Sequence, residues 1–198
     1  MSRFAQLAFT DGVRAQQKAH GSDRAYRRML AGPAEPDRLG AYERAFVAER
    51  DSFYLATVSE TGWPYIQHRG GPPGFLRVLD DHTLGFADFR GNRQYISVGN
   101  LGHDDRVSLF LMDYANRTRL KILGRARVVE DDQELAVAGY AAKVERAVLI
   151  DVEGHDWNCP QHIPQLFPRE AVEHALTHLQ DRVAALEAEN ARLRAASA

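Results

Sequence analysis

The spacing of hydrophobic residues divides the chain into a helical beginning, a β-rich middle and a helical end. Within residues 10–50, apolar side chains recur at the period of short amphipathic helices. Thr10 or Asp11 is expected to cap the first helix, Ser22 the second, and Asp37 the third, which covers RLGAYERAFVAER. We therefore predict a small helical segment ahead of the β-rich part.

From Phe53 onward the pattern is that of short strands rich in β-branched and aromatic residues. FYLATVS and WPYIQHR flank the turn ETG, FLRVL and LGFAD flank DDHT, and RVSLFLMD and TRLKILGRARVV flank YANR. A further strand is expected at ERAVLIDVEG. Strands joined mostly by hairpins predict a mainly β fold with flanking helices (α+β), built as an antiparallel barrel or sandwich.

Three features interrupt the predicted strands. Gly124, inside TRLKILGRARVV, indicates a β-bulge or a close approach of another backbone segment. Helices are predicted over 93–101, RQYISVGNL, and over 131–143, DDQELAVAGYAAK. The strands would therefore be joined by short helices as well as by tight turns.

The end of the chain carries a heptad repeat. Its apolar positions are spaced alternately by four and three residues, with one asparagine among them: Val172, Leu176, Leu179, Val183, Leu186, Asn190 and Leu193. A single Asn at an a position typically specifies a parallel two-stranded coiled coil. An amphipathic helix packed on its own domain is the alternative. We favour the coiled coil, and since so short a coil is marginal alone, we expect the body to dimerise too.

Composition narrows the class of protein. The 198 residues carry a net charge of −2, which argues against a nucleic-acid binder because no basic surplus neutralises phosphates. No apolar run is long enough for a membrane span, and the first residues lack the core of a secretory signal. The single cysteine, Cys159, fits a reducing compartment. We expect a cytoplasmic protein that binds neither nucleic acid nor membrane.

The segment FADFRGNRQ, residues 86–94, is the main candidate for chemistry. A strand is expected to end here and a helix to begin soon after. Gly91 would let the backbone approach a ligand, Asn92 could cap the helix, and Arg93 could hold a phosphate through two N–H groups. A solvated turn would carry the same residues, so local chemistry leaves both interpretations open.

The order of these features resembles the pyridoxamine 5′-phosphate oxidase-like superfamily of FMN-binding split barrels. Phe86, Ala87 and Asp88 match that family's aromatic-Thr-Asn sequence, and Asn92 and Arg93 match the Arg-Lys pair that holds the FMN phosphate. Similar segments precede and follow in the family's order: FYLATVSETGWPYIQHRGG, DDRVSLFLMDY and RLKILGRARVV. The resemblance is strongest to a subgroup of predicted flavin-nucleotide-binding proteins that carry QHRGGPPGF and DWNCPQHI.

The resemblance implies an antiparallel split β-barrel of the FMN-binding type, followed here by the C-terminal heptad helix. We expect an N-terminal helical segment over 1–50, the flavin-binding barrel over 51–165 and the helix over 166–198. In such barrels two subunits form a homodimer, with each FMN in the groove between them. The implied cofactor-binding residues are His68, Arg69, Gly70, Gly71, Phe86, Ala87, Asp88, Asn92, Arg93 and Arg119.

The resemblance also assigns roles to some of these residues. Asn92 and Arg93 would hold the phosphate, residues 68–71 would lie along the ribityl chain and ring, and Arg119 could contact the ring edge, also from the partner chain. Two departures matter: Asp88 replaces a neutral Asn, and Arg119 replaces a Gln. The oxidase's C-terminal Arg-x-His-Asp-Arg substrate segment is absent. FMN binding is therefore expected, and pyridoxamine phosphate oxidation is not.

The expected function is that of an FMN-dependent oxidoreductase acting on an unidentified small-molecule substrate or electron donor. The alternatives are a non-catalytic flavin carrier or sensor, and a relative that binds a deazaflavin or haem. His155, Asp156, Cys159 and His162 could ligate a metal, but a closed zinc site usually draws on two separated pairs, so we expect none. Cys159 could also face the flavin; a small buried residue in a turn is the interpretation we favour.

Overall fold

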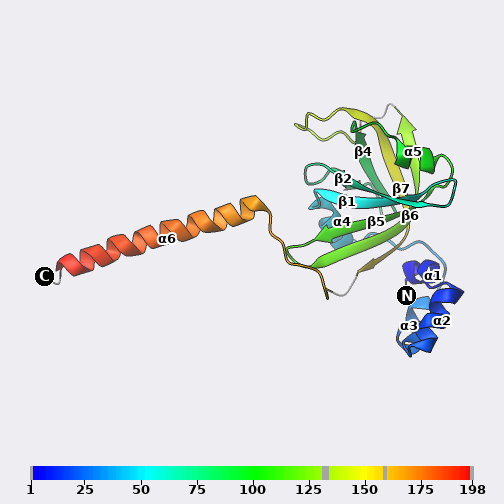
Figure 1. The fold of residues 1–198 in the computed structure, drawn as a ribbon, viewed down its shortest axis with the longest axis horizontal. Helices are drawn as coiled ribbons and strands as arrows, with labels where there is room; N and C mark the ends of the chain where they lie inside the picture. The colour runs from blue at the N-terminus through cyan, green and yellow to red at the C-terminus, as the bar shows by residue number, and fades with distance from the viewer. Residues whose placement is uncertain (1, 131–133, 158–159, 197–198) are drawn as a thin grey trace. The chain divides into compact units, whose positions relative to one another are not determined.

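The computed structural model describes residues 2–130, 134–157 and 160–196. Contacts group the chain into two units: residues 1–113 with 118–160, and residues 114–117 with 161–198. The first unit holds the sheet and the N-terminal helices, and the second holds the long C-terminal helix (Figure 1). The helices are α1 (Arg3–Ala8), α2 (Asp11–Ala19), α3 (Asp23–Tyr26), the 3-10 helix η1 (Arg27–Leu30), α4 (Ala41–Ala48), α5 (Ile96–Leu101) and α6 (Arg169–Ala196).

The described strands form one antiparallel sheet of seven, in the order β2-β1-β5-β6-β7-β4-β3. They are β1 (Ser52–Val58), β2 (Pro64–Gly70), β3 (Leu76–Val78), β4 (Thr83–Phe89), β5 (Arg106–Asp113), β6 (Thr118–Glu130) and β7 (Val144–Trp157). The three predicted hairpins are β1–β2, β3–β4 and β5–β6. The predicted mainly β, antiparallel fold with flanking helices and a C-terminal helix is confirmed, as the split barrel requires.

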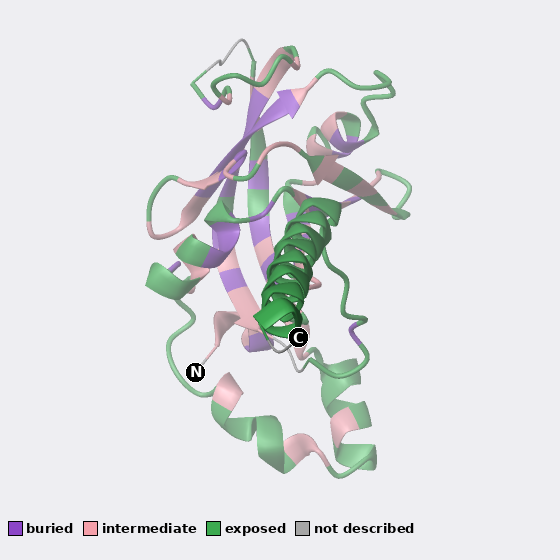
Figure 2. Cartoon of the chain, turned by 90° about the vertical axis from the view of Figure 1, so that its left-hand side faces the viewer, coloured by how far each residue is buried: buried purple, intermediate pink, exposed green. Residues whose placement is uncertain are grey.

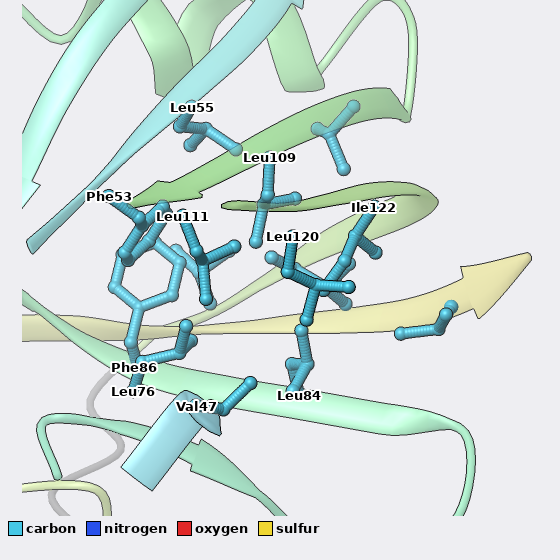
Figure 3. Close-up of a cluster of buried hydrophobic side chains, with 14 of the residues drawn as sticks. Val47, Phe53, Leu55, Leu76, Leu84, Phe86, Leu109, Leu111, Leu120 and Ile122 are labelled. Carbon is cyan, nitrogen blue, oxygen red and sulfur yellow. The ribbon is translucent and has the colours of Figure 1, made fainter. Parts of the chain in front are cut away.

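The sheet curls around one apolar cluster. Strands near both ends of the strand order contribute to it: β1, next to the edge strand β2, adds Phe53, and the opposite edge strand β3 adds Leu76. The helix α4 adds Phe46 and Val47. Figure 3 shows Val47, Phe53 and Leu76 converging between the strands and α4. Since a flat sheet could not bring its two ends onto one core, the common cluster explains the barrel.

Gly124 marks a bulge, as predicted. The register of β6 against β7 shifts between Leu123 and Gly124. A Cβ atom at Gly124 would lie 2.7 Å from the carbonyl oxygen of Asp151, so only glycine fits this approach.

The predicted helix over 131–143 is wrong for its described residues, 134–143, which form turns and irregular segments. The guanidinium of Arg77 donates hydrogen bonds to the carbonyl oxygens of Glu134 and Ala136, at 3.2 and 2.9 Å, which tie this non-helical segment to β3. Gly139 has φ 77°, outside the helical region. Leu135 instead packs in a small second cluster with Ala87 and Ala147.

The N-terminal predictions need two corrections. Thr10 caps α2 as expected, but Asp37 does not cap α4, because α4 begins at Ala41 with Gly40 as its N-cap. The Asp37 carboxylate instead accepts backbone hydrogen bonds from Arg3, Phe4 and His155 at 3.0–3.2 Å. It therefore ties the unpredicted helix α1 to β7.

The helix α6 is exposed along its described length (Figure 2). Within its unit, the Gln165 side-chain amide donates to the carbonyl oxygen of Ala115 at 2.7 Å, which joins the segment before the helix to the 114–117 turn. No helix in the described part of the chain is both long and apolar enough to cross a membrane.

Candidate functional site

A pocket lies where β4 ends and the loop to α5 begins. It is small, with a cavity volume of about 50 Å³, and it opens to solvent. Its walls come from β2, the β4–α5 loop, α5 and the start of β7. The lining residues are Gln67, Arg69, Asp88, Phe89, Gly91, Asn92, Arg93, Tyr95, Ser97, Val98 and Glu145.

Strand alternation directs Gln67 and Arg69 into the pocket. In the β1–β2 ladder Arg69 pairs with Phe53 and Gln67 with Leu55, both fully buried core residues. Side chains of successive residues point to opposite faces, so Gln67 and Arg69 share the core side while His68 points away. The edge strand β2 therefore contributes one cation and one amide to the pocket.

A buried ion-pair network forms the floor. Asp88 pairs with Arg69, and its other oxygen lies 3.9 Å from Nε of Arg146. These side chains are 8%, 13% and 11% exposed, respectively, so their charges compensate one another away from water. Neither arginine Nε has a hydrogen-bond partner among the described residues. The network therefore leaves two N–H donors beside the pocket without an acceptor among the described residues.

The loop after β4 is held in an unusual backbone conformation. The side-chain oxygen of Asn92 accepts from the backbone N–H of Gln94 at 3.2 Å, so Asn92 closes a turn and does not cap α5 as expected. Arg93 and Tyr95 have φ values of 60° and 54°, which non-glycine residues seldom adopt. Such strain is concentrated at functional sites.

Arg93 is the exposed cation of the pocket. Its Nε donates to the hydroxyl of Tyr95 at 3.4 Å, and this bond raises the pKa of Arg93. The same hydroxyl donates to Glu145 at 3.4 Å, and the Tyr95 ring lies against Arg146, 5.1 Å from its guanidinium carbon. Arg93 forms no ion pair with a carboxylate in the described part of the chain. Its charge is therefore free for a ligand.

Two side-chain hydrogen bonds anchor α5 beside the pocket. The hydroxyl of Ser97, itself buried, donates to the side-chain oxygen of Gln67 at 2.7 Å. The Asn100 amide donates to the hydroxyl of Thr57 at 2.9 Å, inside the core. These bonds fix the far wall of the pocket to β1 and β2.

The predicted site residues fall into separate places. Arg69, Asp88, Asn92 and Arg93 gather in the pocket. Phe86 and Ala87 are buried in the apolar clusters. The guanidinium carbon of Arg69 lies over the Phe86 ring, 5.7 Å from its centroid, so the ring stabilises that arginine by a cation–π contact.

The remaining predicted residues lie outside the pocket lining. His68 is exposed and stacks edge-on with Tyr54, with ring centroids 5.7 Å apart. Gly71 packs against Phe75, since a Cβ there would lie 2.8 Å from that side chain, and Gly70 precedes it at the end of β2. Arg119, on β6, lies over the Phe110 ring at 5.4 Å, and its buried Nε has no hydrogen-bond partner among the described residues.

Sequence reasoning missed Gln67, Tyr95, Ser97 and Glu145. Gln67 could have been found, because it stands two residues before Arg69 and shares its face of the strand. Glu145 enters from β7, a partner of β4 that the sequence did not specify. Only the folded sheet brings it to the loop.

The metal candidates do not converge in the part that the structure describes, where no group of three His, Cys, Asp or Glu residues could hold an ion. Asp156 pairs with Lys121 at 2.6 Å, and Nε2 of His155 lies 3.2 Å from the Arg38 carbonyl oxygen. Cys159 lies outside the described residues.

Comparison with known proteins gives a family. The family described as pyridoxamine 5′-phosphate oxidase matches residues 41–180. The chain belongs to this family. The match covers every strand of the sheet, the pocket and the first part of α6. No curated protein sequence matches the chain.

Several solved structures are similar at low identity. A protein from Clostridium acetobutylicum related to general stress protein 26 is 15% identical, with a TM-score of 0.44 over 66% of this chain and 94% of that one. An FMN-binding protein from Syntrophomonas wolfei is 15% identical, with a TM-score of 0.42 over 73% of this chain and 97% of that one. HutZ, a haem storage protein from Vibrio cholerae, is 18% identical, with a TM-score of 0.41 over 60% of this chain and 94% of that one. The assignment therefore rests on the family match and the strand order.

Proposed function

We propose that the chain binds FMN in the pocket at the end of β4 and acts as an FMN-dependent oxidoreductase on a small molecule. The observation that carries the proposal is the convergence of Arg93 and Arg69 in one pocket of a pyridoxamine 5′-phosphate oxidase family member. Arg93 is a charged donor with no carboxylate partner in the described chain, which suits a phosphate group.

The charge balance of the pocket supports an anionic ligand. Its two carboxylates, Asp88 and Glu145, are both already paired, Asp88 with Arg69 and Arg146, and Glu145 with Arg90 at 3.2 Å and with Arg146 at 3.4 Å. Arg93 adds a cation beyond these pairs. A dianionic phosphate would therefore meet a positive surplus, with the side-chain amides of Asn92 and Gln67 as further donors.

In this proposal the protein supplies binding and position. FMN, when bound, supplies the electron or hydride transfer. Arg93 and Asn92 hold the phosphate, Arg69 stabilises its charge from the floor, and the strained loop keeps Arg93 aimed outward. His68, Gly70 and Gly71 would lie further along the cofactor.

We also infer that two copies form the working molecule, as is typical of the family. The outer face of β1, β2 and β5 carries apolar side chains that one chain leaves exposed, including Tyr54 at 40% and Ile66 at 65%. Phe110 pairs with Tyr54 across β1 and β5, so it shares this face. Arg119, on the neighbouring β6, would then approach the cofactor of the partner copy. The α6 helices of the two copies would form the coiled coil.

The single cysteine supports the proposal that this homodimer works in the reducing cytoplasm. Its partners would be a small-molecule substrate or electron donor.

Arg93→Ala tests the cofactor proposal. Loss of a charge-assisted phosphate contact is expected to weaken FMN binding about tenfold to a hundredfold. The measurement is titration of the FMN-depleted protein with FMN, followed by quenching of flavin fluorescence. Arg24→Ala, at an exposed arginine of α3 outside the pocket, is the matched control and should bind like the wild type.

Equal affinity of the Arg93→Ala and wild-type proteins for FMN would contradict the phosphate assignment. Parallel titrations with haemin and with a deazaflavin distinguish the competing ligands. If either bound tightly while FMN did not, the oxidoreductase proposal would give way to that class of cofactor.

A further inference from the structure

The C-terminal helix presents an apolar stripe that its own unit leaves uncovered. The a and d residues of its heptads are about half exposed: Val172 44%, Leu176 52%, Leu179 59%, Val183 53%, Leu186 48% and Leu193 62%. Figure 2 shows the helix exposed along its length. Most helical stability in proteins comes from packing such a face, so α6 requires a partner surface.

The charges beside the stripe match a second copy of the same helix. Position g holds Arg182 and Glu189, and position e holds Glu187 and Arg194. In a parallel, in-register pair, each g residue faces the e residue five positions later on the other helix. Arg182 would face Glu187 of the second copy, and Glu189 would face Arg194, so both contacts are attractive and each occurs twice by symmetry.

Two of these charged residues have no partner within the helix. Arg182 and Glu187 each lack an oppositely charged residue three or four positions away, where intrahelical pairs form. Neither takes part in an ion pair in the described structure. They are therefore available to a facing helix.

Asn190 selects the direction of pairing. In a parallel, in-register pair the two asparagines face each other and can hydrogen-bond. In an antiparallel pair an a residue faces a d residue, which here is always leucine or valine, so Asn190 would be buried against an apolar partner. The charges set the register and the asparagine sets the direction.

We propose that α6 pairs with α6 of a second copy as a parallel, in-register coil selected by Arg182–Glu187 and Glu189–Arg194 contacts between copies. This rests on the proposed homodimer and is independent of FMN. The pairing makes the tail a self-recognition device, because a related helix without this charge order would be disfavoured.

Disulfide trapping in the full chain tests the register. Leu186→Cys is placed in a Cys159→Ser background, since a d residue meets its own copy only in a parallel, in-register coil. After equilibration in a glutathione buffer, most chains should be covalently linked dimers. Ala188→Cys, on the outward f position, is the matched control and should remain largely unlinked.

Charge reversal tests the selection. Adding Arg182→Glu to the Leu186→Cys chain places like charges together and should lower the ratio of linked to unlinked chains about tenfold. Adding Glu187→Arg as well restores attraction and should restore linking. A helix packed on its own domain would not show this rescue.

Other outcomes would overturn the proposal in identifiable ways. Linking only between Val183→Cys and Leu186→Cys chains would mean an antiparallel coil. No linking in any combination would exclude the coil, while unchanged FMN binding by the same chains would leave the cofactor proposal standing. If Arg182→Glu left the ratio of linked to unlinked chains unchanged, the charges would have no role in the selection.

Discussion

At the scale of single residues, Asp88 organises the charges of the pocket. Its carboxylate lies between Arg69 and Arg146, and all three side chains are nearly buried. Removing one partner from such a network leaves the other charges buried without compensation, which costs far more than losing an exposed pair. Asp88 therefore holds Arg69 in place, although its own negative charge repels an anionic ligand bound nearby.

We expect Asp88→Ala to lower the free energy of unfolding by about 3 kcal/mol, because it leaves the buried guanidinium of Arg69 without its carboxylate and removes one of the carboxylates near Arg146. Asp105→Ala removes the partner of Arg125 from a pair about half exposed and should cost less than about 1 kcal/mol. Urea unfolding of both variants gives the comparison. A similar loss of unfolding free energy in the two variants would show that the buried Asp88 network stabilises the fold no more than an exposed ion pair does.

The pocket residues that could be predicted are those whose signal is local. Asn92 and Arg93 follow a strand end within one short segment, and the structure places both in the pocket. Asp88 precedes them on β4, and Arg69 was suggested by the family resemblance. Glu145 could not be found, because it reaches the pocket only through pairing of β7 with β4, more than fifty residues later.

At the scale of elements, α4 is attached to β7 by a hydrogen bond between side chains. The indole N–H of Trp157 donates to the Glu43 carboxylate at 2.8 Å, and the Gly40 N–H donates to its other oxygen at 3.0 Å. Burial raises the pKa of Glu43, but these hydrogen bonds and nearby His155 outweigh it, so its pKa lies below the ordinary value of 4.5. The carboxylate form is the one that binds α4 to the sheet.

A carboxyl group with a lowered pKa in the folded state stabilises the fold above its unfolded pKa and loses that effect as pH falls. Glu43→Gln should therefore reduce the free energy of unfolding at neutral pH by at most about 1 kcal/mol, since the group is partly exposed. The difference from wild type should shrink as pH falls below 4.5. Glu60→Gln, in the exposed β1–β2 turn, is the control, and a difference independent of pH would contradict this account.

The sequence was informative about elements where local chemistry decides. The three hairpins follow from turn residues between alternating strands, and Gly124 marks its own bulge. Residues 134–143 were misjudged because their contacts are distant in sequence: Arg77 binds the carbonyl oxygens of Glu134 and Ala136, and Leu135 packs with Ala87 and Ala147. Asp37 was misassigned for a similar reason, since its hydrogen-bond partners lie on α1 and β7.

At the scale of the whole molecule, the barrel is a packed frame that carries the pocket and two exposed apolar surfaces. One core cluster fixes the strands that carry the pocket. The outer face of β1, β2 and β5 and the stripe on α6 remain apolar and exposed. We infer that one copy is incomplete, and that two copies with two FMN molecules form the functional unit.

The most direct measurement of the central claim is the visible absorbance spectrum of the purified full chain, with mass spectrometry of whatever heat releases from it. The account predicts the two absorbance bands of an oxidised flavin and release of FMN, or their appearance once FMN is added to a colourless preparation. A protein that stays colourless with added FMN, or that releases haem instead, would contradict it.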